Sequence, residues 1–270
     1  MSFYETLRRI WSRHDSLVCV GLDPDTSRIP DHLFESKNPI FEFNRAIVDA
    51  TADLVCAYKP QFAHYAAERA EGQLAMTIDY IHETYPGVPV ILDAKRGDIG
   101  STAKMYAKEA FERYGADALT VNPFLGADSL TPFLENKDRG VVILCRTSNP
   151  GARDIQDLEV DGKKLYQVIA YKASHEWNYN SNILLVVGAT YPEELKEIRY
   201  IVGDMPLLVP GIGAQGGDVE AAIRNGLDSH GTGMIINSSR GIIYAGSGKD
   251  FAFAAREAAK VLRDEINRFR

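Results

Sequence analysis

The sequence contains little cysteine, with three residues among 270, and none of them has the pair spacing of a zinc site. Cys19, Cys56 and Cys145 all lie in apolar, strand-like stretches. An odd number of cysteines in such settings is typical of reduced, buried thiols. The sequence therefore predicts a cytoplasmic protein, and no set of histidines or paired cysteines predicts a metal site.

Long apolar runs are also missing, because no stretch approaches the ~20 residues of a membrane-spanning helix. The first residues contain no apolar core of signal-peptide length. The 37 acidic residues outnumber the 30 Lys and Arg residues, and the net charge is −7. This balance argues against general nucleic-acid binding, although a local basic pocket can still hold an anion. We therefore expect a protein that acts on neither a membrane nor nucleic acid.

What the sequence does contain is a repeated alternation of short apolar runs and helical segments. The expected strands are residues 17–22, 54–58, 90–92, 118–122, 140–145, 183–188, 206–209 and 233–237. Continuous apolar strands are typical of a parallel sheet covered by helices. Eight such units predict an α/β fold, a closed (β/α)8 TIM barrel. An open, doubly wound sheet is the alternative.

Three further segments complete the expected organisation. An extra amphipathic helix is expected at residues 2–13. Because no linker rich in Pro, Gly or Ser divides the chain, residues 1–270 are expected to form a single barrel domain. Ser101 is expected to cap the helix after the third strand. The longest polar excursion, residues 152–163, is expected to be an ordered insertion or a mobile loop.

Charged side chains appear abruptly at the end of the third apolar run, in residues 88–102. Asp93 and Lys95 are two residues apart, so on a strand both project to the same side. Gly97 lets the chain turn, and Asp98 falls just past the strand end. A surface turn with ion pairs is the simpler interpretation. Charges at the end of a run that must be buried nevertheless favour an active site.

In a barrel, the carboxyl ends of all strands surround one site. The polar residues expected there are Asp23, Lys59, Asp93, Lys95, Asp98, Asn122, Ser148, Gln215 and Arg240. The glycine-rich turn at residues 211–217 leads into a helix and offers backbone N–H groups, and Arg240 adds a guanidinium. Phosphate binding by the last two loops is a recurrent barrel arrangement, so the sequence predicts a phosphate monoester as the substrate.

A lysine between two carboxylates narrows the expected chemistry. Burial lowers the pKa of a lysine, whereas two nearby carboxylates raise it. We therefore expect Lys95 to remain an ammonium that can donate a proton, while a Schiff-base lysine needs a free amine. Carboxylates joined by a lysine also form a poor metal cage unless the ammonium moves away.

These motifs together resemble the orotidine 5′-phosphate decarboxylase family, in particular its longer bacterial branch. The matching segments are Asp93-Ala-Lys95-Arg-Gly-Asp98 with Ile99 and Thr102, Gly-Ile-Gly-Ala-Gln215-Gly-Gly, and Ser-Arg240-Gly. The resemblance implies a barrel that decarboxylates orotidine 5′-phosphate to UMP and CO2, the last step of de novo pyrimidine synthesis. It also implies that no cofactor or metal takes part, and that the enzyme is a homodimer with shared active sites.

The resemblance implies a role for each residue of the charged motif. Lys95 matches the proton donor to C6, and Asp93 matches the carboxylate that faces the substrate carboxylate. Lys59 and Asp98 match the rest of an array of alternating charges, although Lys59 is followed by Pro-Gln-Phe-Ala where many relatives have an acidic residue. Asp98 and Thr102 match positions that reach into the partner's site.

The remaining matches concern substrate binding. Asp23 matches a ribose-hydroxyl contact, Ser148 a pyrimidine contact, and Gln215 and Arg240 the phosphate contacts. The alternative within the same superfamily is a Mg²⁺-dependent sugar-phosphate decarboxylase or aldolase, with the metal on the carboxylates of the charged motif. A catalytically silent phosphate-binding barrel is the alternative from another class, but binding an anion gains nothing from two carboxylates.

Overall fold

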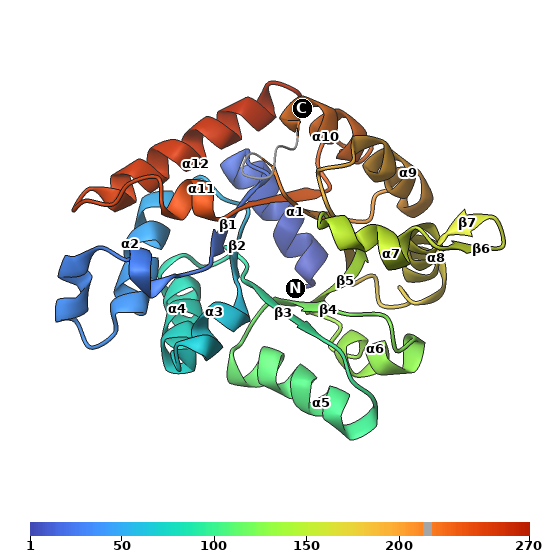
Figure 1. Ribbon diagram of the computed structural model, residues 1–270, viewed down its shortest axis with the longest axis horizontal. Helices are drawn as coiled ribbons and strands as arrows, with labels where there is room; N and C mark the ends of the chain where they lie inside the picture. Colours follow the sequence, from blue (N-terminus) through green and yellow to red (C-terminus); the bar gives the residue numbers. More distant parts are fainter. Residues whose placement is uncertain (213–217) are drawn as a thin grey trace.

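Eight parallel strands form a barrel at the centre of the molecule (Figure 1). In this computed structural model, which describes residues 1–212 and 218–270, the strands are hydrogen-bonded in the order β2-β1-β10-β9-β8-β5-β4-β3. Bridges from Tyr58 to Val90 and from Gln61 to Asp93 join the two end strands and close the barrel. The strands are β1 (Val18–Leu22), β2 (Ala57–Pro60), β3 (Ile91–Arg96), β4 (Ala118–Val121), β5 (Gly140–Arg146), β8 (Ile183–Val187), β9 (Leu207–Pro210) and β10 (Met234–Ser238).

Helices surround the barrel in chain order (Figure 1). They are α1 (Phe3–His14), α2 (Pro39–Thr51), α3 (Phe62–Ala67), α4 (Glu71–Thr84), α5 (Gly100–Lys108), α6 (Ala127–Leu134), α7 (Arg153–Gln156), α8 (Leu165–Tyr171), α9 (Pro192–Val202), α10 (Val219–Gly226), α11 (Arg240–Ile243) and α12 (Phe251–Asn267). The π-helical turns η3 (Glu109–Arg113) and η5 (Lys172–Glu176) extend α5 and α8. None of the helices in the described parts of the chain has both the length and the apolar character needed to cross a membrane.

The strands are apolar on both faces because side chains fill the barrel on one face and helices cover the other. Every residue of β1 and β8 is buried. Each fully buried Val, Leu or Ile side chain contributes roughly 1.5–3 kcal/mol to folding. Cys19, Cys56 and Cys145 belong to this core and are free thiols, as the sequence predicts.

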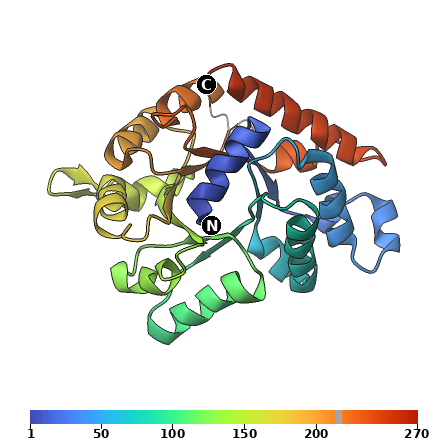
Figure 2. The same cartoon turned by 180° about the vertical axis from the view of Figure 1, so that it is seen from behind.

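Helix α1 lies across the amino-terminal end of the barrel (Figure 2). Ser2 caps the helix through a hydrogen bond from a backbone N–H of its first turn. Phe3 packs where β5 begins, and a Cβ on Gly140 would lie only 2.5 Å from its ring. The Tyr4 hydroxyl donates to the carbonyl of Ile183 at the start of β8. Because α1 covers this end, the carboxyl ends of the strands form the open end.

The structure confirms the expected (β/α)8 barrel with its additional amino-terminal helix, and the open doubly wound sheet is wrong. Two strands extend further than their apolar runs suggest. Strand β2 includes Lys59, and β3 continues through Asp93 and Lys95, because backbone pairing does not end where the side chains become polar. Ser101 does not cap α5, which begins at Gly100.

The polar excursion at residues 152–163 is an ordered insertion and not a mobile loop. It contains η4 (Pro150–Ala152), α7, and an antiparallel hairpin of β6 (Glu159–Val160) and β7 (Lys163–Lys164). The hairpin projects from the side of the barrel beyond α8 (Figure 1).

Candidate active site

The carboxylate of Asp93 on β3 is the centre of a polar cluster at the open end of the barrel. Its side chain is only 10% exposed. Lys59 on β2 donates to one carboxylate oxygen across 2.9 Å, and Lys95 donates to the other across 2.7 Å. Thr120 on β4 also donates to Asp93, across 2.9 Å. One carboxylate therefore joins three neighbouring strands.

The charges of this cluster are stabilised by one another. Burial alone would raise the pKa of Asp93, but the ammonium groups of Lys59 and Lys95 outweigh burial and hold that pKa well below its usual range. Burial would lower the pKa of Lys59, but Asp93 and the more distant Asp23 raise it above its usual value. Asp93 is therefore a carboxylate, and Lys59 an ammonium, throughout the neutral pH range.

Lys95 has an unusual backbone conformation, with a φ of 48° in the left-handed region. The pairing of β3 with β4 shifts register between Leu92 and Arg96, on either side of it. Its backbone N–H donates to the Thr120 hydroxyl across 2.9 Å. A left-handed residue other than glycine costs about 1–3 kcal/mol and is concentrated at functional sites. Thr120 therefore holds both Lys95 and Asp93.

The next residue anchors β3 on the outside of the barrel. The Arg96 guanidinium donates twice to the Glu109 carboxylate, across 2.9 and 3.1 Å. It also lies 4.4 Å from the ring centre of Phe62 and 4.7 Å from that of Tyr106. The strained residue 95 is thus held from both faces of the strand.

A cleft runs from the Asp93 cluster to Arg240. Its first part is a cavity of about 260 Å³ lined by Lys59, Asp93, Lys95, Thr120, Leu144, Thr147, Ser148, Asn149, Val186, Leu208, Pro210 and Asn237. Its second part, about 150 Å³, is lined by Asp23, Pro210, Gly211, Ile212, Asn237, Ser238, Ser239 and Arg240. Because Pro210 and Asn237 line both parts, the two cavities lie side by side.

The Arg240 end of the cleft contains buried polar atoms that lack hydrogen-bond partners in the described chain. One oxygen each of Asp23 and Asn237 is buried and has no hydrogen-bond partner among the residues that the structure describes. β1 approaches β10 so closely here that a Cβ on Gly21 would lie 1.8 Å from the Ser239 hydroxyl. Gln215 belongs to residues 213–217, outside the described part of the chain.

The turn after β5 forms a third wall of the cleft, with Thr147, Ser148 and Asn149. A Cβ on Gly188, just past β8, would lie 2.9 Å from the Ser148 Cβ. Glycine at that position therefore lets the turn lie close against the neighbouring strand. Asn122 does not line either part of the described cleft, and its side chain accepts a hydrogen bond from a backbone N–H two residues on.

Asp98 does not join the cluster of its own chain, contrary to the expectation that Lys95 lies between two carboxylates. In the described structure Lys95 forms an ion pair with Asp93 alone, and Asp98 forms none. Thr102 is exposed on the first turn of α5, away from the cleft. The reason is the turn at Gly97, after which the chain leaves the barrel mouth.

Four apolar side chains in the segments after β3 and β4 are exposed. They are Ile99 and Met105, which lie in the same segment as Asp98 and Thr102, and Phe124 and Leu125, and they are between 47% and 82% exposed. Large apolar side chains gathered on a surface mark interaction sites.

The geometry does not favour a metal on the carboxylates of the charged motif. Both oxygens of Asp93 accept hydrogen bonds, and Asp98 points elsewhere. Within residues 1–212 and 218–270, no three His, Cys, Asp or Glu side chains gather as a metal-ligand set. The expectation of a metal-free reaction stays a prediction for experiment.

The sequence interpretation missed several polar residues of the cleft, namely Thr120, Thr147, Asn149, Asn237 and Ser238. Thr120 and Asn237 are polar residues inside otherwise apolar strands. That exception to the apolar pattern is the signal that could have identified them.

Comparisons with known proteins place the chain among orotidine 5′-phosphate decarboxylases. A profile of the family described as "Orotidine 5'-phosphate decarboxylase / HUMPS family" matches residues 16–255. A Ralstonia pickettii protein named orotidine 5′-phosphate decarboxylase is 62% identical over 270 residues, with both chains covered completely. The structure of OMP decarboxylase from Leishmania donovani has a TM-score of 0.87 at 39% identity, covering 100% of this chain and 98% of that one. The UMP synthase of the same organism has a TM-score of 0.89 at 40% identity, and the match covers 56% of its length.

Proposed function

This chain belongs to the orotidine 5′-phosphate decarboxylase / HUMPS family, and we propose that it converts orotidine 5′-phosphate to UMP and CO2 as a carboxy-lyase of pyrimidine biosynthesis. The observation that carries this function is the Asp93 carboxylate, buried between two lysines at one end of a cleft that reaches Arg240 at the other. A nucleotide with a carboxylate at one end and a phosphate at the other matches that distribution of charge.

Asp93 acts on the substrate carboxylate by repulsion. Two like charges about 4 Å apart repel by about 4 kcal/mol at an effective dielectric constant of about 20. Protonation cannot relieve this repulsion near neutral pH, because the lysines hold the pKa of Asp93 well below its usual range. When the bond from C6 to the carboxylate breaks, CO2 leaves as a neutral molecule and the repulsion disappears. The electron pair of that bond stays on C6.

Lys95 stabilises and then protonates the C6 carbanion. Its ammonium gains attraction to C6 as negative charge develops, and one N–H proton moves to C6 to complete UMP. The resulting amine regains a proton from water. Lys59 is less suited to this role, because its side chain is 5% exposed and that of Lys95 is 47% exposed. Lys59 instead holds Asp93 in place and keeps it charged.

The rest of the cleft orients the nucleotide. We assign Arg240 and Gln215 to the phosphate, Asp23 to a ribose hydroxyl and Ser148 to the pyrimidine. Asp23 supports its assignment through a buried oxygen that has no partner within the described chain, and Ser148 lines the cavity that holds Asp93 and Lys95. Binding at these remote groups positions C6 beside Lys95.

We also infer a homodimer with shared active sites. Asp98 and Thr102 do not line the described cleft of their own chain, and the exposed apolar residues Ile99 and Met105 lie in the same segment. In a two-fold dimer the same surface pairs with itself. Asp98 of the partner subunit would then reach Lys95 and complete the alternation of charges. The protein acts without a cofactor and without nucleic acid, as a single catalytic domain in the cytoplasm, where its free, buried thiols remain reduced.

A single assay tests the proposed reaction. The purified protein is given orotidine 5′-phosphate with and without EDTA, and release of UMP and CO2 is measured. Equal rates in both samples are expected. Loss of activity in EDTA would favour the Mg²⁺-dependent alternative, and no release in either sample would contradict the decarboxylase function.

A further inference from the structure

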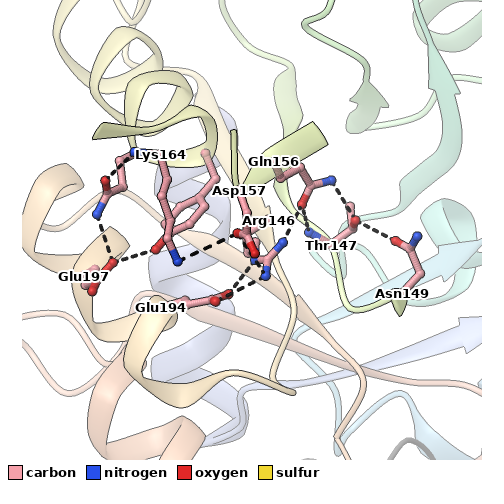
Figure 3. A network of polar contacts seen from close by, with 10 residues as sticks. Arg146, Thr147, Asn149, Gln156, Asp157, Lys164, Glu194 and Glu197 are labelled. Atoms are coloured by element: carbon pink, nitrogen blue, oxygen red, sulfur yellow. Dashed lines mark hydrogen bonds and ion pairs between the residues drawn. The ribbon is translucent and has the colours of Figure 1, made fainter. Parts of the chain in front are cut away.

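The turn that carries Ser148 is tied to the insertion by a single amide side chain (Figure 3). Gln156, the last residue of α7, accepts a hydrogen bond from the backbone N–H of Thr147 across 2.9 Å. The same amide donates to the Thr147 hydroxyl across 2.9 Å. Gln156 therefore contacts both the backbone and the side chain of the residue before Ser148.

Thr147 connects Gln156 to Asn149, the residue that follows Ser148. Its hydroxyl donates to the side-chain oxygen of Asn149 across 2.7 Å. Thr147, Ser148 and Asn149 all line the cleft next to Lys95. Because the amide donates to the Thr147 hydroxyl, the proton of that hydroxyl is directed to Asn149. One amide thus sets the geometry of the whole turn.

Gln156 is held in turn by Arg146, the last residue of β5. Arg146 is 1% exposed, and its guanidinium lies 3.4 Å from the Gln156 amide oxygen and 3.4 Å from Asp157. It also donates to Glu194 of α9 across 3.2 Å (Figure 3). The guanidinium lies over the ring of Tyr191. The insertion is therefore docked on the barrel through a buried guanidinium.

We propose that the insertion at residues 150–164 positions the base-binding turn, and that Gln156 is the positioning residue through which it acts. This inference rests on the proposed function, because it assumes that Ser148 contacts the pyrimidine. It assigns to the insertion a part in recognising the base, separate from binding of the phosphate and from proton transfer by Lys95. Loss of Gln156 then weakens the contacts to the base and leaves those to the phosphate unchanged.

A purely structural role for the network would give a different result. If the network only stabilises the insertion, mutation of Gln156 would lower the melting temperature. It would then weaken the binding of UMP and ribose 5-phosphate equally, or of neither. The ratio of the affinities for a ligand with a base and a ligand without one separates the two roles.

The experiment measures dissociation constants for UMP and for ribose 5-phosphate with wild type, Gln156→Ala and Gln156→Glu. Loss of about two hydrogen bonds predicts about tenfold weaker UMP binding for Q156A. Ribose 5-phosphate binding should stay within about twofold, since Arg240 is untouched. Q156E keeps the acceptor for the Thr147 N–H and loses the donor to the hydroxyl, so its UMP affinity should be intermediate. KM for orotidine 5′-phosphate should rise in the same order, with a smaller change in kcat.

Gln167→Ala is the matched control. Gln167 lies on α8, directly after the insertion. It accepts from the backbone N–H of Lys164 across 2.9 Å and donates to Glu197 on α9 across 3.0 Å. It makes no described contact with Thr147. Q167A should therefore bind UMP and ribose 5-phosphate as the wild type does.

Unchanged UMP affinity in Q156A, or equal loss for both ligands, would overturn the positioning role while the decarboxylase function stands. If Q156A does not fold, the ratio of the affinities for UMP and ribose 5-phosphate is measured with Q156E instead. That ratio then tests the positioning role. A wild-type protein that neither releases UMP from orotidine 5′-phosphate nor binds UMP overturns the proposed function and, with it, this inference.

Discussion

Two clusters of charged side chains occupy the carboxyl ends of the strands, one inside the barrel and one outside. The inner cluster consists of Lys59, Asp93 and Lys95, and the outer cluster of Arg146, Asp157 and Glu194. Each joins neighbouring elements through one central, buried group. The inner cluster places two cations on one carboxylate, whereas the outer cluster places two carboxylates on one cation.

Their surroundings differ as well as their charge balance. Lys95 is half exposed to an open cleft, while the Arg146 guanidinium is 1% exposed and covered by the rings of Tyr166 and Tyr191. In the outer cluster the two carboxylates more than balance the charge of the one guanidinium. The inner cluster has two ammonium groups for one carboxylate, and Lys95 lines the open cavity. Similar ion pairs therefore serve different ends, since only the inner cluster is arranged to receive an anionic ligand.

The largest expected effect comes from breaking the inner cluster at its exposed cation. Lys95→Ala should lower kcat for orotidine 5′-phosphate by about a thousandfold or more, because the other described cation that contacts Asp93, Lys59, has a side chain that is only 5% exposed and cannot replace it as the proton donor. Turnover is measured at saturating substrate, and folding by circular dichroism. Lys249→Ala, on the exposed surface, is the control and should be fully active. Near-normal kcat in K95A would remove Lys95 from the mechanism.

Subunit exchange should show whether the inner cluster is completed by a second chain. Lys95→Ala and Asp98→Ala proteins are each expected to be nearly inactive. A mixed dimer carries both changes in one site and leaves the other site intact. Half of the dimers are mixed after random exchange, so activity should return to about a quarter of wild type. Activity that stays at the level of the parents after verified exchange would place Asp98 within its own subunit.

A mutation that breaks the outer cluster should lower the free energy of unfolding and have less effect on kcat. Arg146→Met leaves Asp157 and Glu194 without their buried partner, which costs about 3 kcal/mol in free energy of unfolding. Urea unfolding measures the loss. Arg224→Met is the matched control, because Arg224 pairs with Glu220 on the surface and should contribute less than about 1 kcal/mol. Equal losses in the two variants would mean that burial does not distinguish the outer cluster.

The smallest expected effect is the pH dependence that the inner cluster adds to folding. The pKa of Asp93 is held below its usual range, so the stabilisation is complete above about pH 4 and disappears as the pH falls through the folded pKa. The pKa of Lys59 is raised, so its contribution is complete below about pH 10 and disappears as the pH rises through the folded pKa. The double variant Lys59→Met, Asp93→Leu lacks both titrations.

Urea unfolding at several pH values tests the direction in which the inner cluster changes stability with pH. The free energy of unfolding of the wild type minus that of the double variant should be constant near neutrality. It should fall in acid and again in strong alkali. A difference that grows in acid would contradict the low pKa of Asp93.

Much of the site could be predicted from the sequence, because it depends on the spacing of polar residues at the ends of apolar runs. A carboxylate and an amine two residues apart at the end of an apolar run must share one side of a strand, and Asp93 and Lys95 do so. Eight apolar runs alternating with helices required a barrel, which brings Lys59 and Ser148 to the same cleft.

What could not be predicted depends on contacts between distant segments. Thr120 matters because β4 lies beside β3, and Gln156 because its insertion folds back onto β5. Neither residue has a local sequence signal beyond a polar side chain. Asp98 was expected beside Lys95, but the turn after β3 separates the two residues. In the described chain Lys95 forms its ion pair with Asp93 alone.

The left-handed backbone at Lys95 has a consequence for how this position evolves. Glycine adopts a φ of 48° without strain, so a fold under no demand for the reaction would gain stability by accepting glycine there. Drift alone would therefore remove the lysine. Lysine at this position therefore serves the chemistry of its side chain at the expense of backbone stability.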